Sequence, residues 1–197
     1  MKRNIIVFVI LIIMISSLSA GPFGMEMGWS IEDLKRNEVQ VQLKEKNYNI
    51  SYYDVIPTLK HPDFDRYMVS IDDLKGIFKI SVFGKTIEVS RYGTDLKSAY
   101  NKIKKQISST YDSPEEYDFL FPGSIWDEPR DWMMSLLKGE RALASFWSLP
   151  KNKDNISMIM LDANALSTDR GYIYLSYESY DSEEIVERNK SQLSNVF

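Results

Sequence analysis

The sequence predicts an α+β fold, in which an antiparallel sheet carries helices packed on one face. Segments in which apolar and polar residues alternate occupy the first and the last third of the chain, as expected for half-buried strands. Helical patterns lie between these two groups, so strands and helices do not alternate one by one as they do around a parallel sheet. Apolar residues make up 44% of the chain, enough for a packed core. We expect a single domain over residues 21–197, with two halves, 21–92 and 93–197, as the alternative division.

The first expected element is a short helix that begins after Ser30. The Ser30 hydroxyl can cap this helix, and Asp33, three residues later, supplies the acid of a capping box. Ile31 and Leu34 then share one helical face, and the helix is expected to end near Asn37.

Extended segments follow, each predicted from its alternation or from its β-branched and aromatic residues. Val39, Val41 and Leu43 alternate with polar residues, and the next segment ends at Pro57. Turns are expected at residues 72–76 and at Gly84. The predicted strands of this meander are 39–43, 48–56, 66–71 and 76–89.

The most regular helical pattern starts after Gly93, with Thr94 as the expected cap. Its apolar residues recur every three or four positions and define one buried face. The residues of this face are Leu96, Ala99, Tyr100, Ile103, Ile107 and Tyr111.

Two further helices are expected in the middle of the chain. Ser113 followed by Pro114 predicts the start of a second, short helix. A third is expected from Pro129 to a stop at Gly139. Its inward-facing residues would be Trp132, Met133, Leu136 and Leu137.

The last third of the chain returns to strands. Residues 141–149 and 171–180 alternate, whereas residues 156–163 are almost all apolar and suit a central strand. A final helix is predicted from Ser182, because two glutamates follow it in the first turn.

The first twenty residues have the three parts of a secretory signal peptide. Lys2 and Arg3 are basic, residues 5–15 are apolar, and small residues lead to Ala20. The apolar run is shorter than the roughly 20 residues that span a bilayer. We therefore expect a cleaved signal and a periplasmic or secreted protein, with an uncleaved signal acting as a tether as the alternative.

Charge and cysteine content restrict the partners and the destination. Removal of Lys2 and Arg3 with the signal leaves 22 basic and 28 acidic residues, so the net charge changes from -4 to -6. This acidic balance argues against nucleic acid as a partner, because its phosphates need a basic patch. The absence of cysteine favours a bacterial periplasm. Gly21 stands where a bacterial lipobox has its lipidated cysteine, so we expect no lipoprotein and no stable membrane anchor after cleavage.

The segment from Phe23 to Leu34 reads FGMEMGWSIEDL. Its glycine, bulky residue and serine lead into an acid-bearing helix, a pattern that resembles the corresponding segment of small exported proteins of Gram-negative bacteria, such as BamE-like outer-membrane assembly lipoproteins. The resemblance implies an exported protein of similar fold style and no particular activity. The chain is longer than BamE-like proteins and lacks their lipidated cysteine, and both departures count against a BamE role.

Residues 123–132 contain the densest group of unusual side chains in the chain. Tryptophan and arginine are frequent anchors of protein interfaces, so this segment is a candidate surface for a protein partner. In the alternative, structural interpretation, its acids cap a helix whose first turn contains Pro129. The candidate binding residues are Trp126, Asp127, Glu128, Arg130, Asp131 and Trp132.

His61 is the only histidine, and Asp63 and Asp65 follow it at alternate positions. In an extended segment the three side chains would share a face and could hold a divalent cation, whereas the alternative is an ordinary polar loop. No cofactor or catalytic residue is assigned. Gly84-Lys85-Thr86 ends like a phosphate-binding loop, but Lys79 stands where the first glycine of that motif is required.

The last predicted strand is rich in tyrosine. Three of its four tyrosines have even numbers and would share one face of a regular strand. An exposed aromatic ladder would suggest a peptide or glycan surface, and the alternative is a half-buried sheet face. These residues are Tyr172, Tyr174, Tyr177 and Tyr180.

These patterns favour binding over catalysis. We expect an exported, non-catalytic protein that binds an unidentified protein partner, and a more specific hypothesis is an immunity or inhibitor protein against an effector that acts in the periplasm. One competing hypothesis is a hydrolase that uses the carboxylates of Asp127, Glu128 and Asp131, or His61 with Asp63. Another is a small-ligand carrier, which would need an apolar cavity under the sheet.

Overall fold

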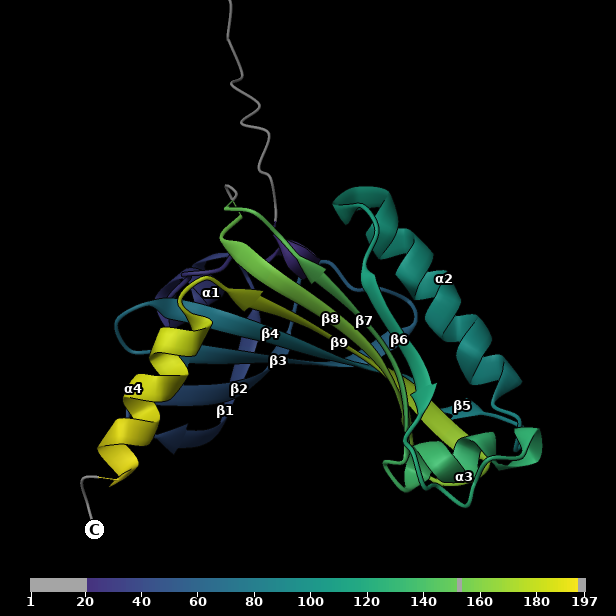
Figure 1. Cartoon of the computed structure of the whole chain (residues 1–197). Coiled ribbons are helices and arrows are strands. Elements are labelled where there is room, and N and C mark those ends of the chain that lie inside the picture. Colours follow the sequence, from purple (N-terminus) through teal and green to yellow (C-terminus); the bar gives the residue numbers. More distant parts are fainter. Residues whose placement is uncertain (1–20, 152–153, 195–197) are drawn as a thin grey trace, which may run out of the picture.

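The computed structural model describes residues 21–151 and 154–194, and the expected signal peptide lies outside them. Nine strands form one sheet in the order β1-β2-β3-β4-β9-β8-β7-β6, and β5 pairs with the first residues of β9 (Figure 1). All of these strand pairs are antiparallel. The predicted α+β fold with an antiparallel sheet is therefore confirmed.

The chain enters the sheet through a short 3-10 helix, η1 (Pro22–Gly24), and helix α1 (Ile31–Arg36). The predicted capping box is present. Ser30 Oγ accepts a hydrogen bond from the Asp33 N–H at 3.2 Å, and the Ser30 N–H donates to the Asp33 carboxylate at 3.0 Å. The helix ends at Asn37, as the sequence predicts.

The first four strands form the expected meander. Leu43 was predicted to lie on the buried face of its strand, but it is 54% exposed. Its strand, β1, lies at the edge of the sheet and has only one neighbouring strand. Tyr48 was predicted to lie in a strand, but its φ of 53° places it in the turn between the first two strands. The bounds are β1 (Gln40–Asn47), β2 (Ile50–Ile56), β3 (Phe64–Asp72), β4 (Gly76–Gly84) and β5 (Ile87–Glu88).

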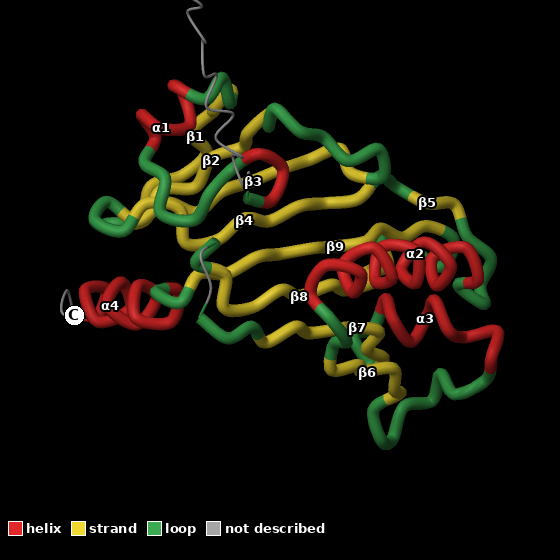
Figure 2. Tube along the Cα trace, turned by 90° about the horizontal axis from the view of Figure 1, so that it is seen from above, coloured by secondary structure: helices red, strands yellow, loops and turns green. Residues whose placement is uncertain are grey.

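The second half of the chain also begins with a helix and contributes four strands to the sheet, with η2 and α3 inserted between β6 and β7. Strand β4 of the first half and β9 of the second half pair in the middle of the continuous sheet (Figure 2). The bounds are α2 (Thr94–Tyr111), β6 (Glu115–Leu120), η2 (Pro129–Asp131), α3 (Trp132–Leu137), β7 (Arg141–Ser148), β8 (Ile156–Ala165), β9 (Arg170–Ser179) and α4 (Ser182–Ser194).

Three local predictions in this half are wrong. The helix expected from Ser113 is strand β6, because the ladder with β7 overrides the local helix-start signal. Thr94 does not cap α2, since Gly93 occupies the cap position in a left-handed conformation, with no side-chain cap bond. Leu137 is 39% exposed, and Ser135 takes a buried position of α3 instead.

One face of the sheet, the helix face, is covered by α2, α3 and the segment before β1 (Figures 1 and 2). The buried stripe of α2 is the predicted one, with Leu96, Tyr100, Ile103 and Ile107 inside. Tyr100 and Ser145 on β7 share a buried hydrogen bond between hydroxyls 2.5 Å apart. These contacts fix α2 across β8 and β9.

The opposite face, the open face, carries helix α4 at one end (Figure 1). There Ile185 packs against Ile50 and Phe78 in a small separate cluster. No other described helix packs on the open face, which leaves its β6–β9 part uncovered. Within residues 21–151 and 154–194, no helix has the length and apolar composition needed to cross a bilayer.

Candidate functional site

Strand β6 lies at one margin of the sheet, as Figure 2 shows. It pairs with β7 in an uninterrupted register from Glu115 opposite Phe146 to Leu120 opposite Arg141. No described strand pairs with its other side. Backbone groups on a free edge can hydrogen-bond to an added strand, so β6 offers a template for a partner segment.

The direction of these backbone groups follows from one hydrogen bond. The Phe121 N–H donates to the Glu140 carbonyl at 2.8 Å, one position beyond the last pair of the β6–β7 ladder. Hydrogen-bonded and non-hydrogen-bonded pairs alternate along an antiparallel ladder. The Phe121 N–H points toward β7, and the direction reverses at each successive residue. Glu116 and Asp118 are an odd number of residues from Phe121, so their N–H groups point to the free side of β6.

Aromatic rings follow the open face of this edge strand. Tyr117, Phe119 and Phe121 are 37%, 40% and 45% exposed. The ring centroids of Phe119 and Phe121 are 4.8 Å apart, and those of Tyr117 and Phe146 on β7 are 5.6 Å apart, both in edge-to-face geometry. We call Tyr117, Phe119, Phe121 and Phe146 the aromatic row. Side chains of this size are rarely left exposed side by side without a partner.

The other edge of the sheet, β1, is built differently. A register shift interrupts its ladder between Leu43 and Glu45. Lys44, at the shift, forms an ion pair with Asp54 at 3.3 Å, and Lys46 forms one with Asp73 at 3.0 Å. Bulges and lysines are devices that keep an edge from pairing with another chain. Only β6 of the two outer strands thus combines a regular ladder with exposed rings.

The segment that contains β6 is strongly acidic. Residues 113–131 hold six acidic residues and one basic residue, a net charge of -5 (1 − 6). Lys104 pairs with Glu116 at 2.6 Å, and Arg141 lies 3.6 Å from Asp118. These two cations come from the helix side of the sheet. Of the other acids, Glu115 and Asp127 are exposed, Glu128 pairs with Arg130, and Asp131 is half-buried. We call residues 115–131 the β6 edge surface.

The structure divides the six predicted binding residues between this surface and the core. Trp132 is buried, with the Lys97 ammonium 4.2 Å from its ring centroid, so it is a structural residue. Glu128 and Arg130 are exposed and form an ion pair at 2.8 Å. Asp127 is exposed, whereas Trp126 and Asp131 are half-buried. The segment therefore contributes charge to the β6 edge surface, and of its two tryptophans only Trp126 is partly accessible to a partner.

The proposed metal ligands have other contacts. Lys102 binds Asp63 at 2.7 Å and holds the pKa of that carboxyl below its ordinary value. His61 Nδ1 accepts a hydrogen bond from the Asp63 N–H and lies 4.0 Å from its carboxylate, too far for the carboxylate to orient the imidazole as a base. Asp65 is exposed. Among the described residues, no three histidine or acidic side chains are close enough to hold a metal ion.

The tyrosines of β9 do not form the predicted three-membered ladder. Tyr172 and Tyr174 lie on the open face beside Phe83, with ring centroids 6.4 Å and 5.2 Å from it. Tyr177 is buried on the helix face, and its pKa is raised by burial. Tyr180 lies beyond the end of β9 and donates a hydrogen bond to the Leu149 carbonyl.

The aromatic row was not recognised in the sequence, although its signal is present. Tyr117, Phe119 and Phe121 occur at every second position, and the residues between them, Asp118 and Leu120, are not aromatic. This period of two indicates a strand, but Ser113-Pro114 directed the interpretation to a helix. The position of the row at a sheet edge depends on pairing with β7, which local sequence does not show.

No protein-family model matches the chain, and searches of curated proteins and of solved structures also find no match. The side chains and the sheet geometry are therefore the basis for a functional proposal.

Proposed function

We propose that the protein is an exported, periplasmic or secreted binding protein without catalytic activity, and that its β6 edge surface binds the positively charged surface of a protein partner. One observation carries this proposal. The regular, uncovered edge strand β6 carries the exposed rings of Tyr117 and Phe119, with exposed Phe121 directly after it, within a segment of net charge -5. Each component of this surface has a separate role in recognition.

The rings and the backbone supply affinity. A buried aromatic side chain removes roughly 150–250 Å² from water, so three rings can form the apolar centre of an interface. A partner segment that extends the sheet at β6 would also pair with the outward N–H groups of Glu116 and Asp118. Acids around an apolar centre resemble the polar rim of known interfaces.

The charge selects the partner. The six acids in residues 113–131 outnumber the three cations that pair with them, Lys104, Arg130 and Arg141. The remaining negative charge attracts a basic surface and speeds its approach, and it repels acidic proteins. It also repels a second copy of the same edge, because two β6 strands placed side by side would bring like charges together. A different, basic protein is therefore favoured over self-association.

The more specific form of the proposal is an inhibitor or immunity protein. An effector that attacks an anionic polymer needs a basic cleft, and an acidic, aromatic edge strand could occupy such a cleft and block it. The hydrolase alternative has less support, because the His61–Asp63 pair lacks base geometry and Glu128 is held by Arg130.

Capture from the native host tests the binding surface. The tagged protein, a Phe119→Asp variant and a Leu74→Asp control would be cross-linked in the periplasm and purified. Leu74 is 78% exposed in the β3–β4 turn, at the other end of the sheet. We expect one basic protein in near-stoichiometric amount with wild type and Leu74→Asp, and its loss with Phe119→Asp. Retention of the partner by Phe119→Asp, or an acidic partner, would contradict the proposal.

Fractionation of the same cells tests export separately. The protein is expected in the periplasm or the medium, at a mass reduced by loss of residues near 1–20. Recovery of the full-length chain in the cytosol would reject the exported part of the proposal and leave the binding part to the capture experiment.

A further inference from the structure

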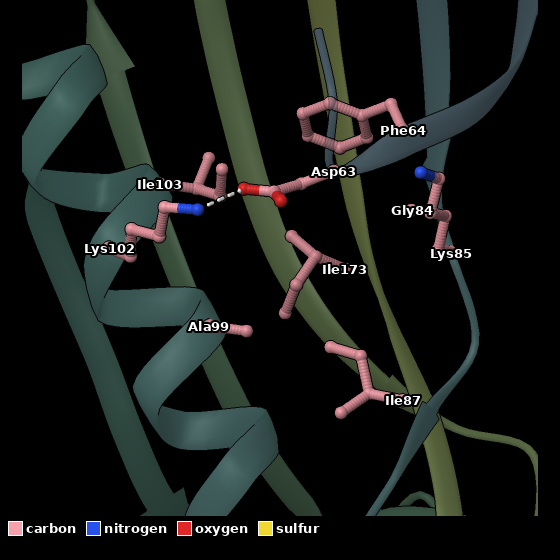
Figure 3. A pocket seen from close by; sticks show the side chains of 9 residues that line it. All are labelled: Asp63, Phe64, Gly84, Lys85, Ile87, Ala99, Lys102, Ile103 and Ile173. Atoms are coloured by element: carbon pink, nitrogen blue, oxygen red, sulfur yellow. Dashed lines mark hydrogen bonds and ion pairs between the residues drawn. The ribbon is translucent and has the colours of Figure 1, made fainter.

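A cavity of about 240 Å³ lies between helix α2 and the sheet, on the helix face (Figure 3). It is separate from the β6 edge surface, because its walls come from the β2–β3 loop, the end of β4, β5, α2 and β9. Its volume lies between the roughly 150 Å³ of a cavity that holds benzene and the roughly 300 Å³ of the smallest drug-sized pockets. A ligand of about ten non-hydrogen atoms suits this size.

The floor of the cavity is apolar. Ala99 and Ile103 reach it from α2, and Ile87 and Ile173 reach it from β5 and β9 (Figure 3). Phe64 closes the end nearest the β2–β3 loop. Five apolar side chains from four elements, α2, β3, β5 and β9, thus surround a space that water would occupy poorly. An alkyl chain or a small ring is the chemistry that such a floor accepts.

The rim of the cavity is charged, with an excess of one cation. Lys102 and Lys85 contribute two ammonium groups, and Asp63 contributes one carboxylate. Lys102 is bound to Asp63 at 2.7 Å, as the dashed line in Figure 3 shows. The backbone N–H of Lys85 donates to the Asp63 carbonyl at 3.0 Å, which fixes Lys85 at the rim. Lys85 is also near enough to contribute to the lowered pKa of Asp63.

The side chain of Lys85 forms no ion pair with any described residue. One positive charge therefore remains uncompensated beside an apolar floor. Figure 3 shows Lys85 and Lys102 on opposite sides of the cavity, and Lys102 already has Asp63 as its partner. A bound anion placed at Lys85 would therefore balance the rim. A neutral ligand would leave the excess charge as it is, and a cationic ligand would increase it.

We propose that this cavity binds a small amphiphile with a single carboxylate, such as a medium-chain fatty acid. The apolar tail contacts Ala99, Ile103 and Ile173, and the carboxylate lies at the rim beside Lys85. This site is independent of the proposed protein partner, so either proposal can fail without the other.

Calorimetric titration of the purified protein with three ligands of equal chain length tests the charge preference. Octanoate should bind with a dissociation constant of roughly 0.1–1 mM, as expected for about ten non-hydrogen atoms. Octan-1-ol and octylammonium should bind at least about tenfold more weakly, because they cannot balance the rim. Equal affinities for octanoate and octan-1-ol would overturn the proposal. The absence of octanoate binding at a ligand concentration about ten times the expected dissociation constant would overturn it as well.

Three variants locate the site. Ala99→Phe fills the cavity from the helix and should abolish octanoate binding, and Lys85→Gln should weaken it about tenfold while octan-1-ol binding stays unchanged. Lys138→Gln, an exposed lysine after α3, is the matched control and should bind like wild type. Unchanged octanoate affinity in Lys85→Gln would reject the site. That substitution is at an exposed residue, so this result does not depend on whether Ala99→Phe folds.

Discussion

The carboxylate of Asp72 is fully buried and accepts a hydrogen bond from the Arg188 guanidinium at 2.5 Å. The same carboxylate also accepts the N–H groups of Leu74 and Lys75 at 3.1 Å and 3.0 Å. Asp72 ends β3, and Arg188 lies in α4, 116 positions further along the chain. This ion pair therefore joins the C-terminal helix to the β3–β4 turn on the open face.

We expect Arg188→Met to destabilise the protein by about 3 kcal/mol, because it leaves a buried carboxylate without its cation. Urea unfolding measures the loss. The control is Lys190→Met, which removes the ion pair between Lys190 and Glu187. The two side chains are 65% and 63% exposed, so this loss should have little effect on stability. Equal stability of the two variants would show that the Asp72–Arg188 pair contributes nothing beyond a surface pair.

Two buried tyrosines predict a loss of stability at alkaline pH. Burial raises the pKa of Tyr100 and of Tyr177 above the ordinary value. The folded state therefore keeps two protons that the unfolded state releases above about pH 10, and the free energy of unfolding falls as the pH rises past that value. At lower pH both states hold these protons, so the contribution is constant.

Thermal unfolding between about pH 8 and pH 11 checks this dependence. Tyr100→Phe and Tyr177→Phe should each flatten the alkaline decline, and Tyr100→Phe starts from lower stability because it loses the hydrogen bond to Ser145. Tyr48→Phe, at a residue 42% exposed, should leave the slope unchanged. A decline as steep in Tyr177→Phe as in wild type would contradict the assignment to that residue.

Gly93 and Trp132 are packed so closely that any side chain at the glycine would clash with the indole ring. A Cβ atom at Gly93 would lie 2.1 Å from Trp132 Cε3, and its φ of 67° is left-handed. We expect Gly93→Ala to cost about 3 kcal/mol, from overpacking and from the backbone conformation together. Gly139→Ala separates the two causes, because Gly139 has a φ of 68° with no atom within 4 Å of its Cβ position. Similar costs for both variants, measured by urea unfolding, would show that Trp132 adjusts without strain.

The parts of the fold that depend on local patterns were predictable from the sequence. The capping box of Ser30 and Asp33 and the buried stripe from Leu96 to Ile107 both follow from spacing within one helix. The Asp72–Arg188 pair and the cavity at Lys85 could not be predicted, since each joins segments far apart in the sequence. The error at β6 has the same origin: Ser113-Pro114 is a genuine local helix signal, but pairing with β7 prevails.

Whether a partner adds a strand to β6 or only contacts its rings can be decided with one pair of variants. Asp118→Pro removes an N–H that points to the free side of β6 and leaves the hydrogen bonds to β7 intact, as proline at a sheet edge allows. Asp118→Ala keeps that N–H and loses the same carboxylate, so it is the matched control.

If the partner extends the sheet, Asp118→Pro should weaken binding by about tenfold or more relative to Asp118→Ala, since at least one interchain hydrogen bond is lost and the partner carbonyl stays unpaired. Surface plasmon resonance with the captured partner measures both affinities, and circular dichroism verifies that both variants keep the sheet. Equal affinities would mean that the aromatic row and the acids bind the partner through side chains alone. In that case Phe119→Asp would still abolish binding, because the ring contacts do not depend on the backbone of Asp118.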